Sequence, residues 1–347
     1  MTRSRVNVVL SQSPSKHPAK RALEESIAAA MIMEPGIDMS VVPHLYDLDS
    51  QHTGRMFLES VSGDMVVLSW LFPRAAYWLL DRDGIRGQFG ETQIKPPDFD
   101  QDEDEESEEP EPPKGIGAAG EIPDRCIYCL NLNDTNKHEV FIEEIRRIAA
   151  ECKQRREANQ AEVARSNPTI VSLGLPNAAP AENNGASHFS PEQLLAAPGR
   201  RWYPVIDYSR CTNCLECLDF CLFGVYGVDG QERILVENQD SCKKGCPACS
   251  RVCPEQAIMF PDFKTPAIAG APVGAIGALK IDLTKLFGGE AKDALTQAVL
   301  ERDTELVKDG RNAVGMTVGI PKRQGDKVAG PKDDLDKLVD DLESLGL

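Results

Sequence analysis

The residues best suited to chemistry in this chain are cysteines, because eight of the eleven lie between residues 211 and 253. They form two runs, Cys211-x2-Cys214-x2-Cys217-x3-Cys221 and Cys242-x3-Cys246-x2-Cys249-x3-Cys253-Pro254. The last three cysteines of each run repeat at an offset of 32 residues, whereas the first repeats at 31. The two runs are therefore an internal repeat with one residue inserted in the second copy. The longer spacer contains Gly245, which can adopt the positive φ that a longer loop needs.

Thiolates at this spacing suit iron–sulfur chemistry. Three cysteines at two-residue gaps let one tight loop offer three thiolates to three irons of a single cubane, so the fourth iron needs a ligand from elsewhere. In bacterial runs of this kind the fourth cysteine binds the other cluster of a pair. The spacing therefore predicts two 4Fe-4S clusters, one held by Cys211, Cys214, Cys217 and Cys253, and the other by Cys242, Cys246, Cys249 and Cys221.

Structural zinc and disulfides are the alternative uses of these cysteines. Zinc takes four ligands in a tetrahedron, usually from two Cys-x2-Cys pairs separated by a longer loop, and two runs of three closely spaced cysteines fit that pattern poorly. Disulfides are rare in a reducing compartment such as the cytoplasm. Iron–sulfur binding is therefore the favoured interpretation.

Residues 201–265 resemble a bacterial-type two-cluster 4Fe-4S ferredoxin on these two cysteine runs, over less than a fifth of the chain. The resemblance implies an α+β domain of βαββαβ order, in which a short helix follows each loop and both clusters lie in an apolar core. The implied strands fall near residues 202–207, 226–228, 234–237 and 257–260. The chain departs from the family at Leu222, where proline is usual, and at the extra residue between Cys242 and Cys246. Neither departure removes a ligand.

The N-terminal part, residues 1–157, is predicted to be an α/β domain. Short apolar runs alternate with helical patterns, which is typical of a parallel sheet covered by helices. The strands are expected at 6–10, 39–43, 65–72 and 126–132, and the helices at 18–33, 54–61 and 137–156. One face of the last helix is predicted to be buried, through Phe141, Ile145, Ile148 and Cys152.

Polar residues follow the carboxyl ends of these strands. Open α/β sheets bind ligands beyond those ends, so an anion or cofactor pocket is one interpretation. The candidate residues are Ser11, Ser13 and Lys16, then His44 and Tyr46, then Arg74, then Asn131, Asn133 and Asp134. The alternative is that these loops are polar as most loops are, and that His44 is an ordinary loop histidine.

Two further motifs in the N-terminal part are interpreted as having no redox or nucleotide-binding role. Cys126 and Cys129 form a Cys-x2-Cys pair, but a redox pair normally opens a helix and this one lies in a strand-like run. Together with Cys152 they are predicted to be buried free cysteines. The pattern Gly115-x-Gly117-x-x-Gly120 lacks the preceding strand and following helix that dinucleotide binding requires, so it is interpreted as linker.

The remaining segments are predicted to be linkers and a tail. Residues 96–115 form an acidic, disordered insertion in the α/β domain, and residues 158–200 form a linker rich in Asn, Ala and Pro. Residues 266–347 combine a Gly/Ala-rich linker with a partly helical tail. The last helix, near 332–345, has an apolar face.

The net charge of −17 narrows the classes of partner. An acidic chain is a poor match for nucleic-acid phosphates and for an anionic membrane surface, so neither partner is expected. No apolar stretch reaches the length of a membrane span, and no signal peptide is recognisable, so the expected location is cytoplasmic. The expected partners are redox proteins that donate and accept electrons through basic docking surfaces.

Together these features favour electron transfer by a two-cluster ferredoxin-type module fused to an α/β domain. They favour a carrier over an enzyme, and they identify no catalytic residue. Two alternatives stay open. One is an oxidoreductase whose α/β domain binds a substrate or cofactor and receives electrons from the clusters. The other is a protein that uses the clusters only to stabilise its fold.

Overall fold

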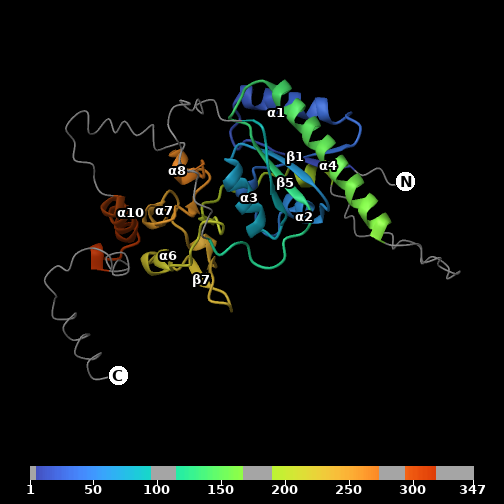
Figure 1. Ribbon diagram of the computed structural model, residues 1–347. Coiled ribbons are helices and arrows are strands. Elements are labelled where there is room, and N and C mark those ends of the chain that lie inside the picture. Colours follow the sequence, from blue (N-terminus) through green and yellow to red (C-terminus); the bar gives the residue numbers. More distant parts are fainter. Residues whose placement is uncertain (1–4, 95–114, 167–189, 273–293, 318–347) are drawn as a thin grey trace, which may run out of the picture.

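The computed structural model describes residues 5–94, 115–166, 190–272 and 294–317. A parallel sheet lies at one side of these residues and the cysteine-rich segment, residues 201–265, lies beside it (Figure 1). Residues 96–114 of the predicted acidic insertion lie outside the described residues, as does the helix expected near 332–345.

The sheet has five strands, all parallel to their neighbours. They are β1 (Val6–Ser11), β2 (Ile37–Val42), β3 (Met65–Ser69), β4 (Gln88–Gly90) and β5 (Cys126–Asn131). Their order is β2-β1-β3-β5-β4. The predicted α/β class with a parallel sheet is confirmed. β4 is not among the predicted strands, because three residues at a sheet edge, two of them exposed, carry too short a hydrophobic pattern.

Helices cover both faces of the sheet. They are α1 (Pro18–Met31), α2 (Thr53–Ser60), α3 (Pro73–Arg82) and α4 (His138–Ser166). One core lies between the sheet and helices α1 and α4, and the other lies between the sheet and helices α2 and α3. Successive side chains of a strand point to opposite faces. Cys126 and Tyr128 of β5 therefore enter the first core, whereas Ile127 and Cys129 enter the second.

Two helices differ from the prediction. α4 continues to Ser166, well into the predicted linker, because residues 158–166 are rich in good helix formers such as Ala, Glu and Gln. α3 is not among the predicted helices. It begins at Pro73, directly after the third strand, and proline is well tolerated at the first position of a helix even though it breaks a helix interior. The predicted linker also contains the short helix α5 (Pro191–Leu194).

The cysteine-rich segment has short elements in the βαββαβ order that the ferredoxin resemblance implies. They are β6 (Val205–Ile206), α6 (Glu216–Phe220), β7 (Tyr226–Val228), β8 (Ile234–Val236), α7 (Ala248–Val252) and β9 (Ile258–Met259). β6 pairs with β9 and β7 pairs with β8, both antiparallel. Each cysteine run therefore contains one short helix.

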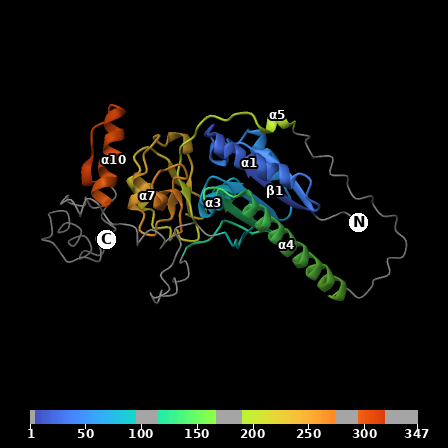
Figure 2. The ribbon, with the colours of Figure 1, turned by 90° about the horizontal axis from the view of Figure 1, so that it is seen from above.

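Elements that follow this segment pack back onto it. α8 (Pro266–Ala269) contacts β9, and α10 (Ala294–Lys308) packs along α7. In both views of the ribbon α7 lies between α10 and the sheet (Figures 1 and 2). α10 lies within the segment predicted to be a partly helical tail. No helix in the described ranges is long and apolar enough to cross a membrane.

The second core of the sheet continues into the cysteine-rich segment. Tyr203, Val205 and Met259 belong to the same buried set as the side chains of α3. Gly270, at the end of α8, has a φ of 102°, and a Cβ there would lie 2.8 Å from the Cβ of Ala75 in α3. The backbone at Gly270, just after the cysteine-rich segment, therefore approaches α3 more closely than a residue with a Cβ atom would allow.

Candidate metal centre

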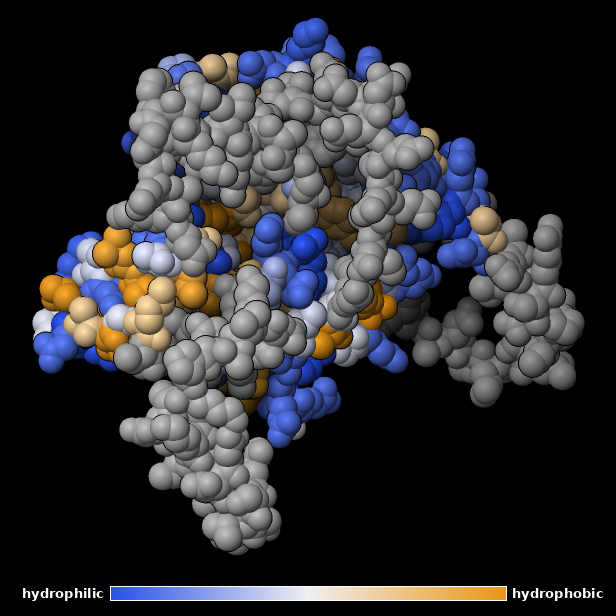
Figure 3. Space-filling model, turned by 60° about the vertical axis from the view of Figure 1, so that its left-hand side comes forward, coloured by the Kyte–Doolittle hydropathy of each residue, from blue (hydrophilic) through white to orange (hydrophobic). Residues whose placement is uncertain are grey.

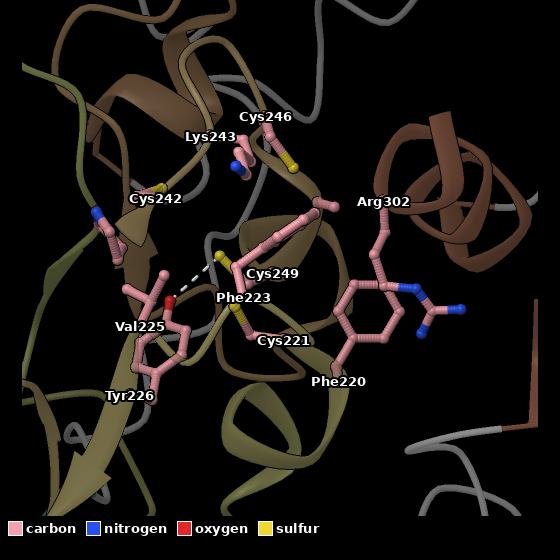
Figure 4. Close-up of a pocket in the computed structure, with 12 residues that line it drawn as sticks. Phe220, Cys221, Phe223, Val225, Tyr226, Cys242, Lys243, Cys246, Cys249 and Arg302 are labelled. Atoms are coloured by element: carbon pink, nitrogen blue, oxygen red, sulfur yellow. Dashed lines mark hydrogen bonds between the residues drawn. The ribbon is translucent and has the colours of Figure 1, made fainter. Parts of the chain in front are cut away.

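Four cysteines line a cavity between α6 and α7 (Figure 4). They are Cys221, Cys242, Cys246 and Cys249. Cys221 directly follows α6, Cys249 lies in α7, and the other two belong to the loop before α7. The walls between the sulfurs are largely apolar, through Phe220, Phe223 and Val225 among others.

The other four cysteines of the two runs line a second cavity. They are Cys211, Cys214, Cys217 and Cys253. Its apolar walls include Ile206, Ile234 and Ile258, and its lining also contains the acidic residues Glu216 and Glu255. The structure thus gathers the eight cysteines into two groups of four. Each group takes three cysteines from one run and one from the other, which is the grouping that the spacing predicts.

The loops that carry three cysteines each depend on residues with a positive φ. In the first loop Asn213 has a φ of 59° and Leu215 a φ of 61°. Asn213 tolerates this conformation because its side chain donates to the carbonyl of Glu232 and accepts from the N–H of Ile234, both at 2.8 Å. Gly245, the equivalent of Asn213 at the repeat offset of 32, has a φ of 86°. The predicted role of this glycine is confirmed.

Burial makes the free thiolates unfavourable in both cavities. It raises the pKa of Cys211 and Cys246 to about 11. It raises the pKa of Cys217, Cys242 and Cys249 further. At neutral pH each of these sulfurs therefore needs a proton or a metal ion to neutralise it, and binding of a metal would displace the proton.

Backbone N–H groups oppose the effect of burial. They lower the pKa of six sulfurs, those of Cys211, Cys217, Cys221, Cys242, Cys246 and Cys253. Cys221, for example, is faced by the N–H groups of Phe223, Gly224 and Val225, in the loop after α6. These dipoles stabilise negative charge on sulfur without placing a cation in the cavity.

The four cysteines of each cavity do not meet at a single point. Within the described residues, no three His, Cys, Asp or Glu side chains converge on a point where one metal ion could be held. A structural zinc ion requires such convergence. In a cubane each thiolate binds a different iron, so the four sulfurs surround a volume rather than meet at a point.

The predicted pocket at the strand ends is not formed, because its central side chains contact the cysteine-rich segment instead. His44 Nε2 lies 3.2 Å from Asp262 Oδ1. The Tyr46 hydroxyl accepts from the N–H of Tyr203 at 2.8 Å and donates to the carbonyl of the same residue. Arg74, in α3, pairs with Asp207 and donates to the carbonyl of Gln256 at 2.6 Å.

The other strand-end candidates serve local turns or point to solvent. Ser11 accepts from the N–H of Leu45 at 3.0 Å, and the N–H of Ser13 donates to Glu24 at 2.6 Å. Asn131, Asn133 and Asp134 bond to one another, and burial raises the pKa of Asp134 to about 6. Lys16 is exposed. No cavity recorded in the described residues joins these side chains to His44, Tyr46 or Arg74.

The three cysteines outside the runs are buried and free, as predicted. Burial raises the pKa of Cys129 to about 12 and that of Cys152 to about 11. The Gly115–Gly120 segment, interpreted as linker, has a structural role: the N–H of Ile116 donates to the carbonyl of Cys211 at 2.9 Å. It therefore braces the first cysteine loop.

Two residues near the cavities were not recognisable as functional from the sequence. The Tyr226 hydroxyl donates to Cys249 Sγ at 3.1 Å, and Arg302 of α10 lines the cavity that contains Cys249. Tyr226 is expected only as part of a strand. The sequence signal that could have identified Tyr226 is the internal repeat, in which Tyr226 corresponds to Ile258 at the offset of 32 residues.

Comparison with known proteins supports iron–sulfur chemistry for part of the chain. A stretch of 66 residues is 48% identical to an uncharacterized ferredoxin of Methanocaldococcus jannaschii. The stretch covers 19% of this chain and 44% of that protein, so less than half of the relative is matched. No family model and no solved structure matches the chain. A ferredoxin-like region is thus present, and iron–sulfur electron transfer is the function that this likeness supports.

Arg74 connects the sheet to the first cysteine loop, which gives a testable prediction. Its partner Asp207 is buried and accepts from the N–H of Cys211 at 2.9 Å through its carbonyl. Arg74→Gln should therefore destabilise the protein by roughly 2–4 kcal/mol, because it leaves a buried carboxylate without its cation. The thermal midpoint followed by intrinsic fluorescence measures this loss.

The control for Arg74→Gln is Arg146→Gln, which breaks a more exposed pair with Glu34. An exposed pair contributes less than about 1 kcal/mol, so the control should barely move the midpoint. Equal shifts in the two variants would contradict the role assigned to Arg74.

Proposed function

We propose that this protein transfers electrons through two 4Fe-4S clusters. The observation that carries the proposal is the pair of cavities, each lined by four cysteines of which three come from one run and one from the other. The likeness of a 66-residue stretch to a ferredoxin supports the same chemistry. We assign Cys211, Cys214, Cys217 and Cys253 to one cluster and Cys242, Cys246, Cys249 and Cys221 to the other.

In this proposal the chain's own residues bind the two clusters, shield them from water and set their reduction potentials. The eight thiolates hold the irons, and each bound cluster would accept and release one electron at a time. Apolar walls such as Phe223 and Ile234 exclude water from the sulfurs. The N–H groups in the loops after α6 and α7 stabilise negative charge on the ligands. These are the means by which a protein sets the potential of such a centre.

We prefer a carrier to an oxidoreductase for a structural reason. The oxidoreductase hypothesis relied on a pocket at the strand ends, and His44, Tyr46 and Arg74 contact the cysteine-rich segment instead. In this proposal the parallel sheet positions the cysteine-rich segment and contributes no catalytic residue.

We also propose a cytoplasmic location and basic redox partners. Eleven free cysteines suit a reducing compartment. The chain has a net charge of −17, which favours docking with a basic surface. The face turned forward in Figure 3 mixes apolar and hydrophilic residues, and exposed apolar side chains on β7 and α10 include Val228, Leu300 and Val307. A mixed surface of this kind suits the small, transient contacts of redox proteins.

The first prediction from the proposal concerns metal content. Anaerobically purified protein should contain about eight irons and eight acid-labile sulfides per chain, because two cubanes hold four of each. Iron and sulfide assays measure this directly. Zinc as the dominant metal, or about four irons per chain, would contradict the two-cluster assignment.

A second prediction tests the exchange of ligands between the runs. Cys221→Ser should perturb the same cluster as Cys246→Ser, because the two sulfurs line one cavity. Cys214→Ser, in the same run as Cys221, should perturb the other cluster. Electron paramagnetic resonance of the reduced variants distinguishes the two signals. If Cys221→Ser instead resembles Cys214→Ser, each run holds its own cluster and the assignment is wrong.

A third prediction addresses the partners. The rate of electron transfer to a basic cytochrome should fall as ionic strength rises, because salt screens the attraction between opposite charges. Stopped-flow absorbance measures this rate, and an acidic acceptor is the control, whose rate should rise with salt. The same salt dependence for both acceptors would argue against docking by charge.

A further inference from the structure

Among the described residues, one hydroxyl group contacts a cysteine sulfur in the cavities, and it lies in one half of the repeat. The Tyr226 hydroxyl donates to Cys249 Sγ at 3.1 Å (Figure 4). Both side chains are buried, with Tyr226 5% and Cys249 8% exposed. A hydrogen bond in such a dry setting is electrostatically stronger than in water.

The internal repeat supplies the comparison. At the offset of 32 residues Tyr226 corresponds to Ile258, and Cys249 corresponds to Cys217. Ile258 is buried and lines the cavity that contains Cys217. Its side chain has no donor, so the sulfur of Cys217 cannot receive an equivalent bond. The two halves therefore have matching ligands but differ at this one donor position.

We propose that the Tyr226 hydroxyl raises the reduction potential of the cluster held by Cys221, Cys242, Cys246 and Cys249, so that this cluster has the higher potential of the two. The inference rests on the proposed function. Reduction adds negative charge to the ligand sulfurs, and an O–H dipole aimed at one of them stabilises the reduced form more than the oxidised form. The first electron to enter the protein then resides on the Cys249 side.

The charged residues around the cavities act in both directions, since Glu301 and Glu305 raise the pKa of Cys246 in the Cys249 cavity. Arg302 is buried and lies 4.6 Å from the Phe220 ring, at the edge of the Cys249 cavity. Its charge is largely balanced by Asp303, 2.9 Å away, just as that of Lys243 is balanced by Asp309 at 2.6 Å. The Cys217 cavity is lined by the carboxylate residues Glu216 and Glu255. The Tyr226 hydroxyl is the side-chain donor in direct contact with a sulfur, so it is expected to dominate.

The test is Tyr226→Phe, which removes the hydroxyl and keeps the ring. Redox titration followed by electron paramagnetic resonance should show the higher of the two potentials falling, while the lower one stays unchanged. A tenfold change in the reduction equilibrium, about 59 mV for one electron, is the expected size. Iron and sulfide content should equal that of the parent protein.

Tyr208→Phe is the matched control. It also removes a hydroxyl from a tyrosine of this segment, but that hydroxyl donates to the backbone carbonyl of Ile234 at 3.0 Å rather than to a sulfur. Both potentials should stay within error of the parent values. A merely structural effect of losing a tyrosine hydroxyl would move them in both variants.

A second variant covers the case in which Tyr226→Phe loses iron. Incorporation of 3-fluorotyrosine at position 226 keeps the ring and the hydroxyl but makes a stronger donor, so it should raise the higher potential. If neither variant moves that potential, or if the lower potential moves instead, the inference is wrong. If the parent protein itself lacks two clusters, the proposed function fails first, and the iron assay shows this separately.

Discussion

The gathering of eight cysteines into two cavities of one small segment is the constraint on which the rest of the structure depends. The strands of this segment have only two or three residues each, so their ladders contribute little to its stability. Buried thiolates are costly, and a core of this size is marginal alone. Metal binding would contribute folding free energy directly. Without a bound metal, the segment depends on N–H groups that face its sulfurs and on neighbouring elements that pack against it.

Residues at the strand ends of the sheet support the cysteine-rich segment through direct contacts. Tyr46 and Tyr203 bond to each other through hydroxyl and backbone groups, and Arg74 reaches Asp207, whose carbonyl accepts from the N–H of Cys211. In many α/β proteins this edge binds a ligand. Here a protein segment occupies the same edge, so polar loop residues act as docking groups. Gly270 completes the contact by permitting close approach to α3.

Local patterns made much of this arrangement predictable. The parallel sheet follows from alternating apolar runs, and the positive φ of Gly245 is one that glycine adopts readily. Contacts between distant residues were not predictable. His44 and Asp262 are 218 positions apart, and no periodicity connects them. β4 is too short for a pattern, and α3 begins at Pro73, a residue that suggests a break when tertiary packing is unknown.

The repeat makes the two halves alike in their cysteines, and the chain outside the repeat makes them unlike in their surroundings. Ile116 donates to the carbonyl of Cys211 and braces only the first loop. α10 packs on α7 and brings Arg302 to the cavity of Cys249 alone. A symmetric pair of centres would hold an electron equally on either side. In the proposed carrier, these one-sided contacts from Ile116 and α10 would make the surroundings of the two centres unequal without touching any ligand sulfur.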